Sequence, residues 1–461
     1  MDSFPLPFPF YLCVLVLVFF GWQAWVARDQ AWGIPMLSVL ATVAAWYLGD
    51  PLYNDYAGYV NNVGTDRLND AWWEVLLFLL ALGMLGPVVN ERMNRGVGDG
   101  RSRILAAMKS REIDSPSFQD QVTKITILLL VPWVILMGTA LIRTDWDVVG
   151  LFFPYLGEKS EPWARDRIGA GIDALYALAS YMQVLLTAFF AVTLALNKRV
   201  FPMLLSAFLF FLSAPYFVFG RTRNSMLAIL LPGLMAFVTL RLRGGIWLRV
   251  GVLLAAFMAL EGWFKFVIDN RDKGTITEAF KTGGSKDEEL KAKKHLGFNM
   301  FEELGYINYF IENGSYKVNW GERYFAEIVN PVPRVLWPGK PMIGIDYAIA
   351  RGMGYGDQAA KSGGVAASIS TGMIGQGVVN FGRILGPLAS ALLMAFWVAV
   401  LARQDLMGRD IGHMLLYAIG LVLTFNMGRD ITLLVIYPFV FGWLLLILFQ
   451  RGKPHGVAPS S

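Results

Sequence analysis

The chain of 461 residues is 55% hydrophobic and only 16% charged, so it is more apolar and less charged than an ordinary soluble domain. Its formal net charge of +5 does not indicate nucleic acid, because the basic residues fall in short segments between apolar runs, and we expect no nucleic-acid partner. A single cysteine, Cys13, excludes an intramolecular disulfide and a cysteine-rich metal site.

The apolar runs predict an all-α, polytopic integral membrane protein with about eleven transmembrane helices. We expect these spans near residues 7–27, 33–49, 72–90, 124–142, 170–196, 201–219, 224–240, 249–268, 384–402, 412–428 and 431–449. The segment 366–382 is too polar for a span and indicates a re-entrant or interfacial segment. The chain thus divides into N-terminal transmembrane helices (1–268), one large water-exposed loop (269–365) and C-terminal transmembrane helices (366–461).

Charge sets the expected orientation. The inter-helix segment 91–123 is rich in arginine and lysine, so it should stay on the cytoplasmic side, and the first apolar run should be a retained helix. Counting spans from this segment places the N-terminus and loop 269–365 outside and the C-terminus inside. Arg221, Arg223 and Arg429 then lie at outer span ends, against the charge rule, so either a ligand holds them there or they snorkel and pair locally.

The second half of the large loop contains the most specific string, NPVPRVLWPGKP at 330–341. Its four prolines fix backbone torsions around Arg334, Trp337 and Lys340, so this segment cannot be a regular helix. Rigid turns suit an arginine and a lysine that are presented to a phosphate. The alternative is a structural return of the chain to the bilayer, with Trp337 as an interface anchor.

A general base is expected among the carboxylates that flank this aromatic-rich half, namely Glu302, Glu303, Glu322 and Asp346, with Glu303 favoured. Such loop carboxylates can equally be solvated groups without a chemical role. The three histidines are scattered, so the sequence supports no metal site and suggests no cofactor.

Three strings resemble one known family. PVPRVLWPGKP is similar to the Pro-Arg, Trp-Pro and Lys-Pro signature in the large periplasmic loop of bacterial oligosaccharide repeat-unit polymerases, the O-antigen polymerase (Wzy-like) family. GRTRNSMLAIL at 220–230 resembles the start of that family's mid-chain span, and GQGVVNFGRILG at 375–386 resembles the Asn-Phe-Gly stretch that opens the span after the loop. The likeness covers the general layout and these strings, not a continuous alignment.

The resemblance implies a membrane glycosyltransferase at the periplasmic face of the bacterial inner (cytoplasmic) membrane. It would polymerise undecaprenyl-pyrophosphate-linked oligosaccharide repeat units into a surface polysaccharide, with a chain-length regulator and a flippase as possible neighbours. The enzyme must neutralise a departing pyrophosphate and activate an acceptor hydroxyl. We expect Glu303 and Arg334 to be catalytic, and pyrophosphate or glycan to be bound by Arg221, Arg223, Arg334, Trp337, Lys340 and Arg429.

Three other functions remain open on the sequence. A transferase similar to O-antigen ligases has the same layout but delivers the glycan to another acceptor. A flippase or transporter for lipid-linked oligosaccharides is disfavoured by the missing inverted repeat and the single large loop. A non-catalytic subunit would use the same cations to bind lipid headgroups.

Overall fold

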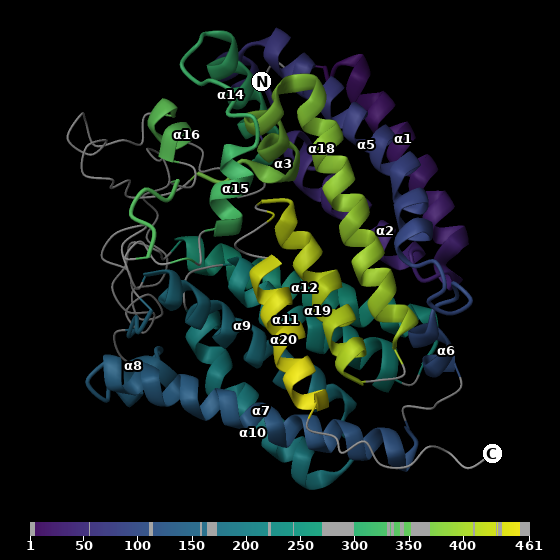
Figure 1. Ribbon diagram of the computed structural model, residues 1–461, viewed down its shortest axis with the longest axis vertical. Coiled ribbons are helices and arrows are strands. Elements are labelled where there is room, and N and C mark those ends of the chain that lie inside the picture. Colours follow the sequence, from purple (N-terminus) through teal and green to yellow (C-terminus); the bar gives the residue numbers. More distant parts are fainter. Residues whose placement is uncertain are drawn as a thin grey trace.

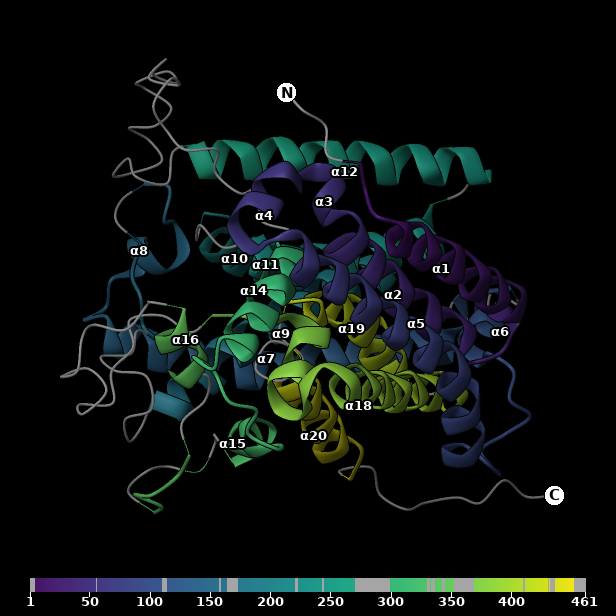
Figure 2. The same cartoon turned by 90° about the horizontal axis from the view of Figure 1, so that it is seen from above.

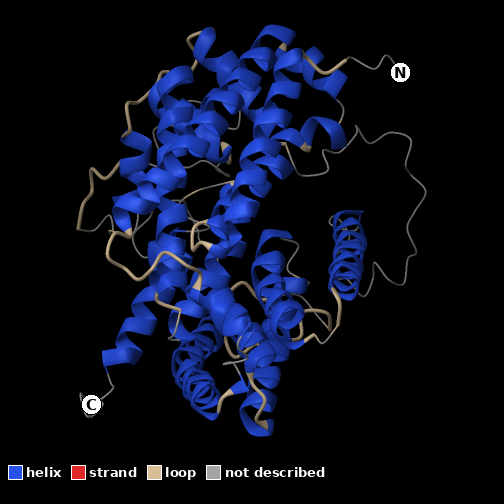
Figure 3. Ribbon diagram, turned by 90° about the vertical axis from the view of Figure 1, so that its right-hand side faces the viewer, coloured by secondary structure: helices blue, strands red, loops and turns tan. Residues whose placement is uncertain are grey.

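The computed structural model describes residues 5–54, 56–109, 114–156, 159–163, 173–219, 223–242, 244–269, 299–329, 332, 336–341, 345–351, 369–408, 411–429, 431 and 436–451. Within these ranges the protein is helical and forms no β-strand (Figure 3). The all-α expectation is therefore confirmed for the part of the chain that the structure describes.

Six of the described helices are long and apolar enough to cross a membrane. They are α1 (Phe8–Val26), α5 (Thr65–Met93), α7 (Pro116–Arg143), α9 (Asp173–Leu196), α10 (Val200–Val218) and α18 (Gly372–Leu406). Shorter apolar stretches lie in α2 (Gly33–Val43) with the following π-helical turn η2 (Ala44–Leu48), α11 (Arg223–Ala236), α12 (Ile246–Asp269), α19 (Ile411–Met427) and α20 (Tyr437–Arg451). Within the described residues each expected span thus overlaps an apolar helix, and six of these helices meet the length and hydropathy needed for a crossing.

The remaining helices are short or amphipathic and connect the apolar ones. They are α3 (Asp50–Tyr53), α4 (Tyr56–Val63), α6 (Arg103–Lys109), α8 (Val148–Phe152), α14 (Met300–Glu312), α15 (Glu322–Val329) and α16 (Ile345–Ala350), with the turns η1 (Ala27–Asp29) and η4 (Phe237–Arg241). Figure 1 shows α14 and α3 at one end of the molecule, whereas α6 lies far from them. The helices of the large loop therefore lie away from the basic segment 91–123.

Two helix groups form the bundle, and α19 joins them. On one side α5 packs against α18 and α1, and on the other α9 packs against α10 and α11. The C-terminal helix α19 contacts α2 and α18 in the first group and α11 in the second (Figure 1). In Figure 2, α12 lies along one edge of the molecule, and among the described contacts its Trp263 indole donates a hydrogen bond to the Val218 carbonyl at 3.1 Å.

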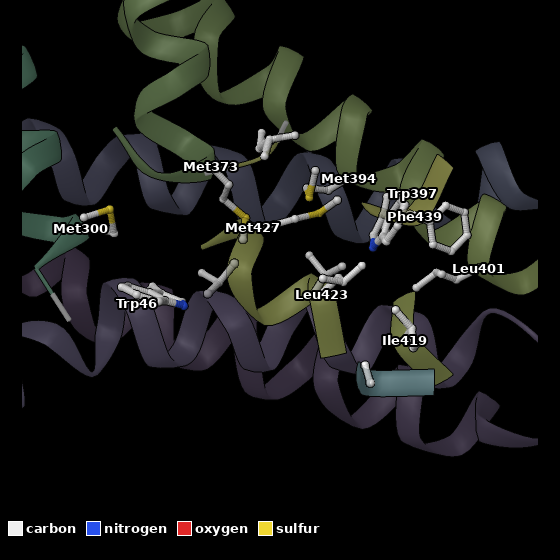
Figure 4. Packing of buried hydrophobic residues seen from close by; sticks show 14 of the residues in the cluster. Trp46, Met300, Met373, Met394, Trp397, Leu401, Ile419, Leu423, Met427 and Phe439 are labelled. Carbon is white, nitrogen blue, oxygen red and sulfur yellow. The ribbon is translucent and has the colours of Figure 1, made fainter. Parts of the chain in front are cut away.

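The bundle core is rich in methionine and tryptophan. Met373, Met394 and Met427 gather there with Trp46 and Trp397 (Figure 4). Both indoles are satisfied, since Trp46 donates to the Phe425 carbonyl and Trp397 to the Thr424 hydroxyl, each at 2.8 Å. Such pairing is needed because a buried donor without an acceptor is costly.

The helix α18 is a hairpin of two arms, 372–381 and 383–406, that reverses at Gly382. Gly382 has φ 78° and ψ −177°, which interrupts the helical backbone. The hydroxyl of Ser390 donates to the carbonyl of Met373 at 2.8 Å, although a straight helix would separate residues 17 apart by about 25 Å. The first arm therefore folds back against the second, which agrees with the re-entrant alternative for 366–382.

The arms of the hairpin approach closely because both carry glycine. A Cβ on Gly377 would lie 2.1 Å from the Gly386 carbonyl oxygen, and a Cβ on Gly386 would lie 2.6 Å from the backbone of Gly377. The first arm begins at the end of α19, where the Gly372 amide donates to the Arg429 carbonyl at 3.0 Å. The second arm, which contains the expected span 384–402, runs alongside α5, since Arg383 pairs with Glu74 and the Ala399 carbonyl accepts from Asn94 just after α5.

Candidate functional site

Four of the seven predicted site residues can be placed with their side chains: Glu303, Trp337, Lys340 and Arg429. Arg221 and Arg334 lie outside the described residues. Arg223 is the first residue of α11, and its side chain is likewise outside the described part. The predicted roles of these three arginines stay predictions.

Glu303 lies buried on the first turn of α14. Its carboxylate accepts hydrogen bonds from Tyr347 of α16 and from Arg351, which directly follows α16. The Tyr347 hydroxyl donates to Oε1, and Arg351 donates through Nε at 3.3 Å and through Nη2 at 3.2 Å. The Arg351 guanidinium also lies 3.6 Å from the centre of the Tyr306 ring. Burial, and then the negative charge of Glu303, raise the pKa of Tyr347, so its hydroxyl remains a donor.

Asp50, the first residue of α3, attaches α14 to the segment that follows α2 and η2. Its carboxylate accepts from the Tyr59 hydroxyl at 2.6 Å, the Asn54 amide at 2.7 Å and the backbone amides of Phe301 at 2.9 Å and Glu302 at 3.3 Å. These amides belong to the first turn of α14, where a helix has unpaired donors and favours a negative charge. Burial raises the pKa of Asp50 to about 6, although all four donors favour its charged form.

The proline-rich segment is held by its own residues and by α15. The Lys340 ammonium is buried and donates to the Val332 carbonyl at 2.9 Å. The Trp337 ring lies edge-on to the Phe325 ring of α15, with ring centres 6.1 Å apart. Lys340 thus makes a structural contact, and its binding to pyrophosphate stays a prediction.

Arg429 lies at the end of α19, beside the start of the α18 hairpin. Its side chain is exposed, and Nε donates to the Ser370 hydroxyl at 3.1 Å. Asp430, the next residue and a candidate for local pairing with Arg429, lies outside the described residues. An exposed guanidinium therefore lies where the large loop re-enters the bundle.

A further cation, Arg323 on α15, was not singled out in the sequence. It is only 5% exposed, and its Nε lies 3.8 Å from Oε1 of Glu327, one helical turn later. The other carboxylate oxygen of Glu327 accepts from the Gln376 amide of the α18 hairpin at 2.6 Å. Among the described residues, no group accepts a hydrogen bond from Nε or Nη1 of Arg323. The Arg-Glu spacing of four was a visible signal, but burial could not be foreseen.

The tip of the α18 hairpin contacts α15. The Tyr324 amide donates to the Asn380 side-chain oxygen at 3.3 Å, and the Tyr324 and Phe381 rings lie 6.1 Å apart. Since Trp337 packs on Phe325 of α15, this helix touches both the Asn-Phe-Gly stretch and the proline-rich segment. Two strings that are separate in sequence therefore meet at one short helix.

We define the polar cluster as Glu303, Arg323, Glu327, Tyr347, Arg351 and Gln376. Tyr347 lies near both halves of the cluster, because its pKa, which is raised mainly by burial, is also influenced by the charges of Glu303, Arg351 and Arg323. The hairpin tip is fixed nearby, where Arg383 pairs with Asp70 and with the buried Glu74 of α5. The cluster thus lies where α14, α15, α16 and the hairpin converge on the bundle.

Within the ranges that the structure describes, no group of three or more His, Cys, Asp or Glu side chains could hold a metal ion. The arrangement offers paired ionic groups, hydroxyl and amide donors, and exposed aromatic rings instead. In comparisons with known proteins, no family model matches the chain, and neither a curated protein nor a solved structure does.

Proposed function

We propose that the protein is a membrane enzyme that polymerises undecaprenyl-pyrophosphate-linked oligosaccharide repeat units. The observation that carries this proposal is the meeting of the proline-rich segment and the Asn-Phe-Gly stretch at α15, next to the polar cluster. Both strings carry the resemblance to repeat-unit polymerases. Their approach gives one place where residues from distant parts of the chain can act on a single substrate.

The proposed topology has eleven crossings, with the polar cluster on the outer face of the bacterial inner membrane. Two contacts support placing the cluster opposite the basic segment 91–123. Arg383 pairs with Glu74 near the start of α5, whereas Asn94, which follows α5, donates to the Ala399 carbonyl at 2.9 Å. The second arm of α18 and α5 therefore run in the same direction, from the cluster toward the basic segment.

In the proposed reaction, an acceptor hydroxyl oxygen attacks the anomeric carbon of the donor's lipid-linked sugar. The bond from that carbon to the pyrophosphate oxygen breaks, and undecaprenyl pyrophosphate leaves while the hydroxyl proton passes to a base. Exposed cations near the membrane surface, such as Arg429, would neutralise the departing pyrophosphate, with Arg221, Arg223 and Arg334 as further candidates. The Glu303 carboxylate accepts hydrogen bonds from Arg351 and Tyr347 in the described structure. Its proposed role as the base therefore requires that these hydrogen bonds break.

The length distribution of surface glycan on gels tests the proposal. Cells with the wild-type chain should show a ladder, and cells without the chain should show a single repeat unit. Arg429→Ala and Arg334→Ala should shorten the ladder, whereas Arg95→Ala, an exposed arginine in the basic segment, should not. All variants are compared at equal membrane abundance.

A ladder that persists without the chain would overturn the proposal. Loss of all surface glycan, with lipid-linked precursor retained on the inner leaflet, would indicate a flippase. A full-length ladder that stays on its lipid carrier would indicate a ligase.

A further inference from the structure

The start of α15 carries buried polar atoms that lack partners among the described residues. They include Nε and Nη1 of Arg323, which donate, the side-chain oxygen of Asn319, which accepts, and the hydroxyl of Tyr324. Proteins rarely leave such atoms unpaired, because each one has lost its hydrogen bonds to water. A ligand at this place must therefore offer both acceptors for Arg323 and a donor for Asn319.

The charge around Arg323 disfavours a phosphate. Glu327 lies 3.8 Å away and offsets the guanidinium, and Glu303 offsets Arg351 in the same way. Glu302, next to Glu303 on α14, is also buried; burial, and then the negative charge of Glu302, raise the pKa of Tyr306. The polar cluster and its surroundings thus carry no excess positive charge, so a doubly charged anion would meet repulsion from the carboxylates.

Sugar hydroxyls fit this combination of atoms. A hydroxyl both accepts and donates, and the planar fork of an arginine can donate to two neighbouring hydroxyl oxygens. An aromatic surface is also at hand, since Trp320 is 71% exposed in the turn before α15. Trp320 has φ 52°, which a residue with a side chain rarely adopts. The backbone of this turn is therefore strained at the residue that carries the exposed ring.

We propose that Arg323, Asn319 and Trp320 form a sugar-binding subsite, in which Arg323 recognises hydroxyls of the glycan rather than the pyrophosphate. This inference rests on the proposed function, and it assigns the two ends of the substrate to different residues. The sugar is held at the start of α15, and the pyrophosphate is left to exposed cations such as Arg429. The subsite would select which repeat unit the enzyme accepts.

The test measures binding by the purified full-length protein in detergent, with two probes. One is undecaprenyl pyrophosphate without sugar, and the other is the lipid-linked repeat unit extracted from cells that lack the chain. Arg323→Met should weaken binding of the glycosylated lipid about tenfold or more and leave binding of the bare carrier within about twofold. Arg67→Met, which removes a more exposed arginine that pairs with Glu312, serves as the control and should change neither affinity.

Trp320→Ala is the second variant, because this exposed residue can be removed with little effect on folding. This variant too should weaken binding of the glycosylated lipid only. If Arg323→Met does not fold, the result for Trp320→Ala tests the inference alone. Equal weakening of both probes would make Arg323 a phosphate ligand and overturn the inference, as would unchanged binding in both variants. A wild-type protein that binds the glycosylated lipid selectively but forms no polymer would refute the polymerase function and leave the subsite standing.

Discussion

Substitution of Gly377 by alanine should disrupt the α18 hairpin. The added Cβ would lie 2.1 Å from the Gly386 carbonyl oxygen and 2.3 Å from the Ser390 hydroxyl, which already donates to Met373. Overpacking of this kind costs about 1–3 kcal/mol. Alanine in place of glycine within a helix gains about 0.5–1 kcal/mol, so the clash dominates in most of this range.

The net expectation is a loss of about 1–2 kcal/mol in the free energy of unfolding. Thermal melting of the purified protein in detergent measures it, with membrane abundance as a second readout. Gly251→Ala in α12 is the matched control, because nothing lies within 4 Å of its added Cβ. If Gly377→Ala melts at the same temperature as Gly251→Ala, the two arms of α18 do not pack as described.

Three other substitutions test contacts around the site. Asp50 has a pKa raised to about 6 from 3.8, so the folded protein holds its proton more tightly than the unfolded chain. The free energy of unfolding should therefore fall as pH rises from about 4 to above 6, by up to about 3 kcal/mol, and Asp50→Asn should remove this contribution. Tyr347→Phe removes the hydroxyl that donates to Glu303 and should cost about 1–3 kcal/mol at neutral pH. Lys340→Met removes the donor to the Val332 carbonyl and should loosen the proline-rich segment, which limited proteolysis would detect as faster cleavage there.

Each of these has a clear contrary result. An equal pH dependence of melting in wild type and Asp50→Asn would mean that Asp50 does not titrate between pH 4 and 6. Unchanged melting in Tyr347→Phe, judged against Tyr11→Phe on an exposed part of α1, would remove the support for the contact with Glu303. Cleavage of Lys340→Met at the wild-type rate would show that the ammonium does not hold this segment.

Local sequence patterns predicted the positions of the apolar helices, because length and hydropathy are properties of single segments. In the part of the chain that the structure describes, each expected span overlaps an apolar helix, and six of these helices are long and apolar enough to cross. For residues 366–382 the sequence left two alternatives, a re-entrant segment and an interfacial one, and the fold-back of α18 agrees with the first. This fold-back depends on Gly377 meeting Gly386 and on Ser390 meeting Met373, which a single-segment pattern cannot display.

The candidate site was predicted only in part, because its geometry comes from long-range contacts. Glu303 was singled out, but its ion pair with Arg351 joins residues 48 apart. Asp50 was missed, since its role depends on amides of α14 that lie 251 and 252 residues away. Arg323 was not predicted: an arginine and a glutamate four apart are the pattern of a solvated helix pair, and only the packing of α15 against the hairpin buries them.

The most direct test of the central claim is reconstitution of the purified protein in liposomes with the lipid-linked repeat unit as the only substrate. The proposed function predicts a ladder of longer glycans on undecaprenyl pyrophosphate, released carrier in equal number to the bonds formed, and no need for a nucleotide sugar. Repeat units that stay single, in a preparation that melts cooperatively and binds the lipid, would contradict polymerisation by this chain alone.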